Sequence, residues 1–269
     1  GQDLLIEGRT HPMLPRLIGM IHLAALPGSP QYGGDFTAVV DAAVSDAKVL
    51  ESAGFEGLMV ENFGDVPFYA DDVPKATVAA MTHAIGRVGD AVSLPLGVNV
   101  LRNDAAAALA VAASTGAAFI RVNVLSGVMY TDQGPIIGRA AEIARMRAAL
   151  APNVAVMADV FVKHAAPPPG ITIEQAAEEL AGRALADAVI VSGTSTGRPP
   201  TLPLLRKVVG AVPETPVYLG SGVTASSVTR FLSVATGVIA GTSLKKRGVT
   251  TNPVDPKKAK AFIAAARGK

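Results

Sequence analysis

Short apolar runs rich in β-branched residues alternate along the chain with longer alanine-rich stretches that also carry polar residues. The short runs have the length and composition of buried strands, and the stretches between them consist largely of good helix formers. The runs predict eight strands, over Leu17–Leu23, Gly57–Asn62, Leu96–Leu101, Phe119–Leu125, Val154–Val162, Ala188–Ser192, Pro216–Leu219 and Gly237–Ala240. The stretches predict eight helices, over Thr37–Ala53, Pro74–Gly89, Asp104–Thr115, Gly138–Leu150, Ile173–Leu185, Thr201–Val209, Ala225–Leu232 and Pro256–Ala266.

Eight strand–helix units in succession predict an α/β fold, a single closed parallel (β/α)8 barrel. An open doubly wound sheet is the alternative, but it usually has fewer strands. The run Pro167–Gly170 is typical of a rigid loop and marks no domain boundary. We therefore expect one barrel over residues 13–269. Residues 1–12 are expected to be a tag or a disordered extension, because Ile6–Arg9 resembles a protease-cleavage linker.

The alternation of side chains within the strands predicts which of them face the inside of the barrel. In the fourth strand Ile120 and Val122 share one face, and Arg121 and Asn123 share the other. The outer face of a parallel barrel packs on helices and must be apolar, so the polar pair must face inward. The same argument places further polar residues inside, near the C-terminal strand ends: His22, Glu61, Asn99, Asp159, Lys163 and, just after its strand, Ser192. Barrel enzymes build their active sites at that rim.

Composition narrows the classes of function. The chain has 269 residues, of which 49% are hydrophobic and 17% charged, as expected of a globular fold. It contains no cysteine, which excludes disulfides, thiolate metal sites and cysteine nucleophiles. Its net charge is only +2, it has no tryptophan, and aromatic residues make up 4%. These values argue against nucleic-acid binding, which relies on basic surfaces and stacking side chains.

The mean hydropathy of +0.38 raises the question of a membrane span. The uncharged stretch 105–120 is interrupted by Ser114, Thr115 and Gly116, and a span needs about 20 mostly apolar residues. We therefore expect no transmembrane segment. The first twelve residues are polar and carry both charge signs, unlike a secretory signal. The expected location is cytoplasmic, with peripheral membrane contact through Lys245–Arg247 and Lys257–Lys260 left open.

Two glycine-containing tripeptides follow the last two predicted strands, Gly220-Ser221-Gly222 and Gly241-Thr242-Ser243. Glycine lets backbone amides approach a phosphate closely, and a following helix N-terminus would add partial positive charge. The loops after strands 7 and 8 form the recurrent phosphate site of this fold. We therefore predict phosphate binding there, although the glycines of both tripeptides are also compatible with tight turns alone.

Glu61 and Asp159 are the candidate general acid and base, because a carboxyl group buried in a rim pocket can exchange protons with a substrate. Asp65, in the loop after the second strand, is a further candidate. Lys163 is a catalytic candidate too, with a Schiff-base amine as one role. The alternative is structural: Arg121 and Lys163 would simply neutralise the two inward-facing carboxylates.

Several polar residues are candidates for binding the rest of a substrate: His22, Asn99, Arg121, Asn123, Ser192 and Thr194. The last two belong to a hydroxyl-rich stretch after the sixth strand, which is also typical of an ordinary turn. His22 could instead be a general base, a metal ligand or a satisfied core histidine. The four histidines show no metal-ligand spacing, so we predict no metal site and no cofactor, with a divalent metal as the alternative.

Seven segments of the chain together resemble one known family, the BtpA family, also called BtpA/SgcQ. They are Gly19–Leu23 with Leu26–Pro30, Glu61–Asp65, Gly97–Asp104, Phe119–Asn123, Thr131–Gly134, Ala158–Val160 with Lys163–Ala165, and Gly220–Thr224. The resemblance runs from about Leu17 to the C-terminus. It implies a fold among the phosphate-binding TIM barrels, which include the tryptophan synthase alpha subunit. The segment around Glu61 and Asp65 is similar to the acid–base region of that subunit, with a different spacing.

The family resemblance leaves two functions open. The first is an enzyme, a lyase or isomerase, that acts on a small phosphorylated metabolite. The second is a non-catalytic assembly factor, since the family is named after a member linked to photosystem I biogenesis; such a factor would carry an exposed apolar patch. A homo-oligomer is compatible with either function.

Overall fold

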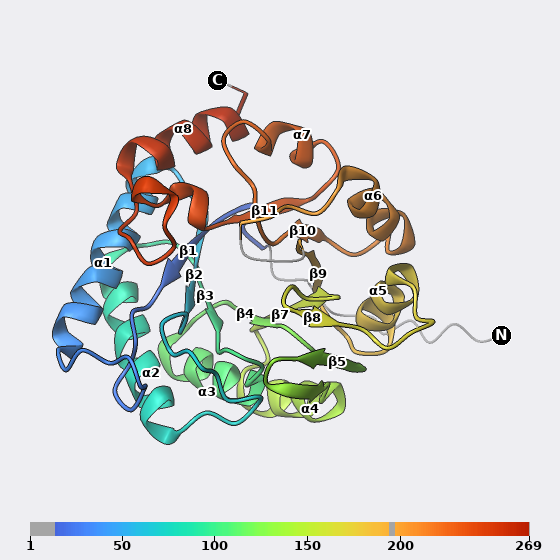
Figure 1. Cartoon of the computed structure of the whole chain (residues 1–269), viewed down its shortest axis with the longest axis horizontal. Helices are drawn as coiled ribbons and strands as arrows, with labels where there is room; N and C mark the ends of the chain where they lie inside the picture. Colours follow the sequence, from blue (N-terminus) through green and yellow to red (C-terminus); the bar gives the residue numbers. More distant parts are fainter. Residues whose placement is uncertain (1–13, 194–196, 269) are drawn as a thin grey trace.

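The computed structural model describes residues 14–193 and 197–268, and within them eight parallel strands close into a barrel (Figure 1). Neighbouring strands pair in the order β1-β2-β3-β4-β7-β9-β10-β11, and β11 returns to β1. Their bounds are β1 Leu17–His22, β2 Gly57–Glu61, β3 Leu96–Asn99, β4 Phe119–Val122, β7 Ala155–Val160, β9 Ala188–Val191, β10 Val217–Leu219 and β11 Gly237–Ala240. The predicted fold is confirmed, and each barrel strand lies within a predicted run. The expected extension 1–12 lies outside the described residues.

Helices form a ring around the barrel strands in Figure 1. Their bounds are α1 Phe36–Ala53, α2 Lys75–Ala91, α3 Ala105–Thr115, α4 Ala140–Leu150, α5 Ile173–Gly182, α6 Leu202–Ala211, α7 Val228–Leu232 and α8 Pro256–Ala266. Short polar side chains begin several of them. Asp104 accepts a hydrogen bond from the backbone of Ala107, and Thr201 accepts one from Leu204. These bonds satisfy backbone donors that the first turn of a helix leaves free.

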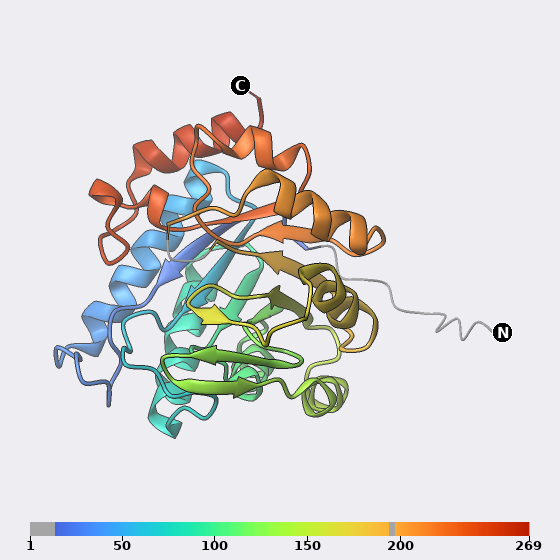
Figure 2. The ribbon, with the colours of Figure 1, turned by 45° about the vertical axis from the view of Figure 1, so that its right-hand side comes forward.

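A second, small antiparallel sheet was not predicted from the sequence. It consists of β5 Val128–Thr131, β6 Gly134–Ile137 and β8 Ala165–Ala166, in the order β6-β5-β8. Figure 2 shows the β5–β6 hairpin beside the barrel strands, in the connection between β4 and α4. The prediction was also wrong at α7, which starts at Val228 and not at Ala225. Two short 3-10 turns, η1 Thr242–Leu244 and η2 Lys246–Gly248, follow β11.

The predicted alternation of faces is confirmed by two separate apolar clusters. The larger one lies between the outer face of the strands and the helices, and includes Val60, Val98, Ile120 and Val122. The smaller one fills the inside of the barrel with Ile18, Met20, Met59, Phe119, Ala155, Met157, Ala188, Ile190, Tyr218 and Ile239. The next inward position is polar on six strands and glycine on β10 and β11, so a largely polar layer covers this inner cluster towards the C-terminal mouth.

Large and small residues alternate inside the barrel. A Cβ atom on Gly97 of β3 would overlap the Phe119 ring of β4, and one on Gly237 would overlap the Tyr218 ring. Both glycines therefore leave room for an aromatic ring of a neighbouring strand. This inner packing forms the floor under the polar layer.

We predict that Gly97→Ala lowers the free energy of unfolding by about 1–3 kcal/mol, because an added methyl group overpacks a filled core. Denaturant unfolding measures the change. Gly86→Ala in α2 is the matched control, since nothing lies within 4 Å of its Cβ position and alanine favours a helix interior. Equal effects of the two substitutions would contradict this account of the barrel interior.

Candidate active site

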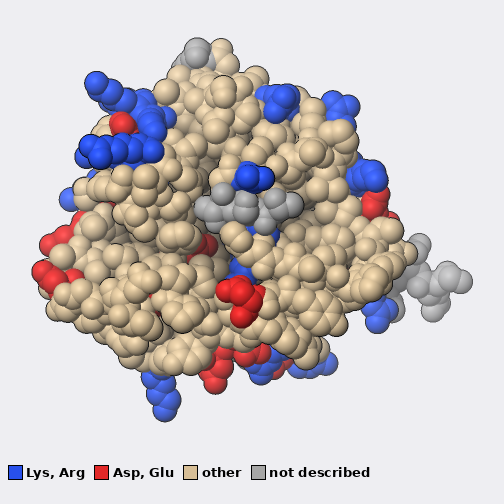
Figure 3. Space-filling view, viewed as in Figure 1, with Lys and Arg blue, Asp and Glu red and all other residues tan. Residues whose placement is uncertain are grey.

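A cavity of about 820 Å³ opens at the C-terminal mouth of the barrel. Met20 and Ile239 of the inner cluster lie at its base. Ten of the residues selected from the sequence line it: His22, Glu61, Arg121, Asn123, Lys163, Gly220, Ser221, Gly222, Gly241 and Thr242. The mouth face carries both charge signs, mostly around its periphery, with a smaller group near its centre (Figure 3). The polar strand ends therefore converge on one cavity.

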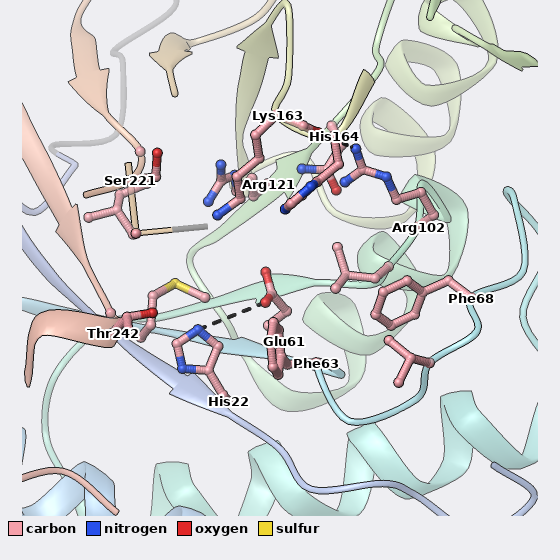
Figure 4. A pocket seen from close by; sticks show the side chains of 18 of the residues that line it. His22, Glu61, Phe63, Phe68, Arg102, Arg121, Lys163, His164, Ser221 and Thr242 are labelled. Carbon is pink, nitrogen blue, oxygen red and sulfur yellow. Dashed lines mark hydrogen bonds and ion pairs between the residues drawn. The ribbon is translucent and has the colours of Figure 1, made fainter. Parts of the chain in front are cut away.

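His22 and Glu61 are register partners at the ends of β1 and β2. His22 Nε2 lies 4.0 Å from Glu61 Oε1, and the edge of the Phe63 ring contacts the imidazole at a centroid distance of 5.1 Å (Figure 4). Burial raises the pKa of Glu61, although the cations Lys163, Arg121 and Arg102 partly oppose the shift. A buried carboxyl group whose pKa is raised holds a proton more readily than an exposed one, which suits it to proton transfer.

Burial, together with the charges of Lys245, Lys163 and Arg121, holds the pKa of His22 well below its ordinary value. The imidazole is therefore neutral at pH 7. Its Nδ1 is buried and has no hydrogen-bond partner in the part of the chain that the structure describes. Gly241 makes room for the ring, because a Cβ atom there would come within 3.0 Å of His22 Cε1.

Arg121 and Asp159 form a two-pronged ion pair inside the barrel. Arg121 Nε donates to Asp159 Oδ2 at 2.8 Å, and Nη2 donates to Oδ1 at 2.7 Å. Asn123 Nδ2 donates to the same carboxylate at 3.0 Å, and Asn99 Nδ2 donates to Asn123 Oδ1 at 3.2 Å. Burial alone would lower the pKa of Arg121, but the carboxylate of Asp159 raises it. Arg121 and Asp159 therefore match the structural alternative drawn from the sequence, in which inward-facing cations and carboxylates neutralise one another.

Asp159 does not line the large cavity, and its side chain is fully buried. Both of its oxygens accept hydrogen bonds from Arg121 or Asn123, so it holds these side chains in place. These contacts are those of a positioning residue, and the proton transfer expected of Asp159 from the sequence stays a prediction. Asn99 is buried as well, and its Nδ2 donates to Asn123 Oδ1 and to the backbone oxygen of Arg121.

Lys163 lies just after β7, and its backbone forms hydrogen bonds with residues of two neighbouring loops. Its N–H donates to Ser192 Oγ at 3.2 Å, and its carbonyl oxygen accepts from Arg102 Nη2 at 2.6 Å. Burial and then the charge of Arg121 lower the pKa of the ammonium group. Within residues 14–193 and 197–268, no carboxylate forms an ion pair with Lys163. Unlike Arg121, the Lys163 side chain is therefore not held by a described carboxylate, and it lines the cavity.

The loops after β10 and β11 present backbone N–H groups at one end of the cavity. Ser221 Oγ is already used, since it accepts from Gly193 N and donates to the carbonyl oxygen of Arg198. Gly222 has a φ of +71°, and a Cβ atom on it would overlap Pro199. Among the described residues, no acceptor takes a hydrogen bond from the N–H groups of Ser221, Gly222 or Thr242.

The helix expected from about Ala225, just after the first tripeptide, begins three residues later, at Val228. Helix α7 begins six residues after Gly222 and is five residues long. Any positive potential at this end of the cavity therefore comes from the loop amides and from Arg121. A Cβ atom on Gly220 would lie 3.1 Å from Arg121 Nη2, which places that guanidinium beside the glycine loop.

Three selected residues have other partners and do not line the large cavity. Asp65 accepts from Leu26 N at 2.8 Å and from the side chain of Asn62. Ser243 Oγ donates to the carbonyl oxygen of Val223, and Ser192 Oγ accepts from Lys163. Their side chains stabilise loops around the mouth. Thr194 lies outside the described residues.

Sequence reasoning missed several residues that line the cavity: Gln31, Phe63, Val66, Pro67, Phe68, Leu101, Arg102, Asp132, Gln133 and His164. All of them lie in loops beyond the strand ends, where the alternation rule no longer applies. Across residues 14–193 and 197–268, no three His, Asp or Glu side chains cluster as a metal site would require. In the same part of the chain, no helix is both long and apolar enough to cross a membrane.

The family model described as "BtpA family" matches residues 13–268. The photosystem I biogenesis protein BtpA of Synechocystis sp. is 45% identical, over 98% of this chain and 91% of its own length. An uncharacterized protein of Thermococcus kodakarensis is 48% identical, over 93% of this chain and 95% of its own. These relatives match almost the whole chain.

Solved structures with the same fold are much more distant in sequence. A tryptophan synthase from M. tuberculosis has a TM-score of 0.60 at 18% identity and covers 94% of this chain and 93% of its own. A phosphoribosyl anthranilate isomerase from Thermus thermophilus has a TM-score of 0.57 at 11% identity, with 94% and 98% covered. At such identities these similarities establish the fold alone.

Burial of Glu61 predicts a pH-dependent cost of folding. Because its pKa is raised in the folded protein, the folded state binds more protons than the unfolded state between the two pKa values. The free energy of unfolding contributed by Glu61 therefore falls as the pH rises through that interval. We predict that Glu61→Gln gains stability relative to the wild type on going from about pH 4 to about pH 8, where glutamate in proteins is normally ionised.

Denaturant unfolding of both proteins at several pH values measures this difference. Glu142→Gln, on the exposed side of α4, is the control and should show no such trend. A Glu61→Gln difference that is constant with pH, or that reverses, would show that Glu61 is not destabilised as an anion.

Proposed function

The chain belongs to the BtpA family, and we propose that it is an enzyme that acts on a small phosphorylated metabolite by lyase or isomerase chemistry. One observation carries the proposal. A single cavity brings backbone N–H groups of Ser221, Gly222 and Thr242, which have no acceptor among the described residues, together with a buried carboxyl group, Glu61, whose pKa is raised. The first feature suits a phosphate, and the second suits proton transfer to or from carbon or oxygen.

The phosphate is proposed to bind between the loops after β10 and β11. Backbone N–H groups there can donate directly to phosphate oxygens. The Arg121 guanidinium beside Gly220 adds a positive charge whose orientation Asp159 maintains. The free-energy cost of removing the phosphate from water is thereby offset by hydrogen-bond donors that are already in position.

The proton is proposed to move through Glu61. Figure 4 shows Glu61, His22 and Phe63 on one side of the cavity, and Lys163, Arg121 and His164 on the opposite side. A substrate between them places one face towards a carboxyl group and the other towards cations. In lyase and isomerase reactions at a carbonyl compound, a base removes a proton while a cation stabilises the negative charge on the carbonyl oxygen. We propose Glu61 for the first role and Lys163 for the second.

Lys163 could alternatively form a Schiff base with a carbonyl substrate, because its amine is buried and its pKa is lowered. His22, which is neutral, is proposed to hydrogen-bond to the substrate or to Glu61. The proposed proton transfer and charge stabilisation use only side chains of this chain, so we propose no cofactor. Asn123 lines the same cavity and would orient polar groups of the substrate.

The second candidate is a non-catalytic assembly factor. It rests on the printed name of the Synechocystis relative and on two exposed apolar side chains of the small sheet, Tyr130 and Ile137, which are 54% and 63% exposed. Such side chains can contribute to a protein contact. They do not account for the buried carboxyl group and cations of the cavity, whose burial costs folding free energy. We therefore favour the enzyme.

Calorimetry with a panel of sugar phosphates and their unphosphorylated counterparts tests the phosphate site. We predict that wild-type protein binds phosphorylated compounds selectively and that Thr242→Asp abolishes this binding, because a carboxylate beside the proposed phosphate repels it. Thr242→Asn is the matched control, since asparagine has the size of aspartate without its charge. It should retain binding within about threefold of the wild type.

Gly222 is a less suitable position for this test, because any side chain there would overlap Pro199. Two results would overturn the proposal: no phosphorylated compound binds to the wild type, or Thr242→Asp and Thr242→Asn bind equally well.

A further inference from the structure

The cavity has two ends with different polar groups. In Figure 4, Ser221 and Thr242 lie at one end, whereas Arg102 and Phe68 lie at the other. Glu61 and Lys163 lie between these ends, on opposite sides. A ligand whose phosphate occupies the first end and that extends through the cavity therefore reaches Arg102. The proposed function leaves this second end unassigned.

Arg102 is a nearly buried cation, with 6% of its surface exposed. Its backbone N–H donates to the carbonyl oxygen of Tyr69, and its Nη2 donates to the carbonyl oxygen of Lys163 at 2.6 Å. These bonds fix the loop after β3 and the direction of the side chain. In the described part of the chain, no carboxylate oxygen lies within ion-pair distance of the guanidinium. Arg102 thus has further N–H donors besides Nη2 and no anionic partner among the described residues.

The charges around Arg102 leave a positive excess at this end. Asp159 is committed to Arg121, and Glu61 faces Lys163 as well as Arg102. Asp132, the remaining carboxylate of the lining, is exposed to solvent, which weakens its effect. A nearly buried guanidinium without a counter-ion is costly, and a bound anion would remove that cost. A planar guanidinium also matches carboxylate and phosphate oxygens.

We propose that Arg102 forms a second anion subsite, so that the substrate carries a phosphate at one end and a carboxylate or a second phosphate at the other. The reacting carbons then lie between the two anions, beside Glu61 and Lys163. The inference rests on the proposed function for its first phosphate. The cavity volume of about 820 Å³ is near the upper part of the range for small-molecule sites.

Calorimetry with matched pairs of compounds tests the subsite. Fructose 1,6-bisphosphate is compared with fructose 6-phosphate, and 6-phosphogluconate with glucose 6-phosphate. We expect the doubly anionic member of at least one pair to bind on the order of tenfold to a hundredfold more tightly, as a charge-assisted hydrogen bond would provide. The first pair reports a second phosphate and the second pair a carboxylate.

Four substitutions separate the subsite from general effects. Arg102→Met should abolish the preference and leave the affinity for the singly phosphorylated compound within about threefold, whereas Arg102→Lys should retain part of the preference. Asp132→Asn should increase the preference, because it removes a negative charge from this end. Arg139→Gln, at an exposed arginine paired with Glu142, is the control and should change nothing.

The outcomes distinguish this inference from the proposed function. If the wild type binds both members of each pair equally, the second subsite does not exist, although the phosphate site stands. A preference that survives in Arg102→Met places the second anion elsewhere and also overturns the inference. If no compound binds, both proposals fail. Should Arg102→Met not fold, as thermal unfolding would reveal, Arg102→Lys and Asp132→Asn must move the preference in opposite directions for the inference to stand.

Discussion

The buried ion pair between Arg121 and Asp159 sets the electrostatics of the barrel mouth. The two side chains exchange two hydrogen bonds, and Asn123 adds a third. Burial is the dominant cause of the raised pKa of Glu61; the charges of Lys163, Arg121 and Arg102 oppose the shift, and the charge of Asp159 adds to it. Without Asp159, Arg121 would stabilise the glutamate anion and weaken Glu61 as a proton carrier.

Along its axis, the barrel has an apolar interior, then a layer of mostly polar side chains, and then the loops that surround the cavity. Its interior is filled by apolar side chains up to Met20 and Ile239, and the next inward positions, at the ends of the strands, are polar on six strands and glycine on two. Backbone amides of the loops after β10 and β11 lie at one end of the cavity above this layer, and Arg102 lies at the other. The proposed reaction uses this order: anchoring groups at the ends, and groups that move protons or stabilise charge in the middle.

Much of this arrangement is predictable from the sequence, because strand alternation is a strict geometric rule. It places Glu61, Arg121 and Asp159 inside the barrel correctly. It cannot place Arg102, which lies beyond the end of β3, where the loop path decides the direction of the side chain. Nor could the sequence show that Asp65 and Ser243 do not line the cavity. Both form hydrogen bonds with backbone groups of loops that are distant in the sequence. The small sheet was missed because its strands are only two to four residues long.

The central claim is that Glu61 moves a proton of a phosphate-anchored substrate. The most direct measurement is hydrogen exchange in deuterated water, followed by nuclear magnetic resonance, with phosphorylated aldoses and ketoses. Wild-type protein should exchange the hydrogen on the carbon beside the carbonyl group of at least one compound, and Glu61→Gln should slow this exchange by roughly 10²- to 10⁴-fold without a comparable loss of binding. Exchange at the wild-type rate in Glu61→Gln, or none in the wild type, would contradict the claim.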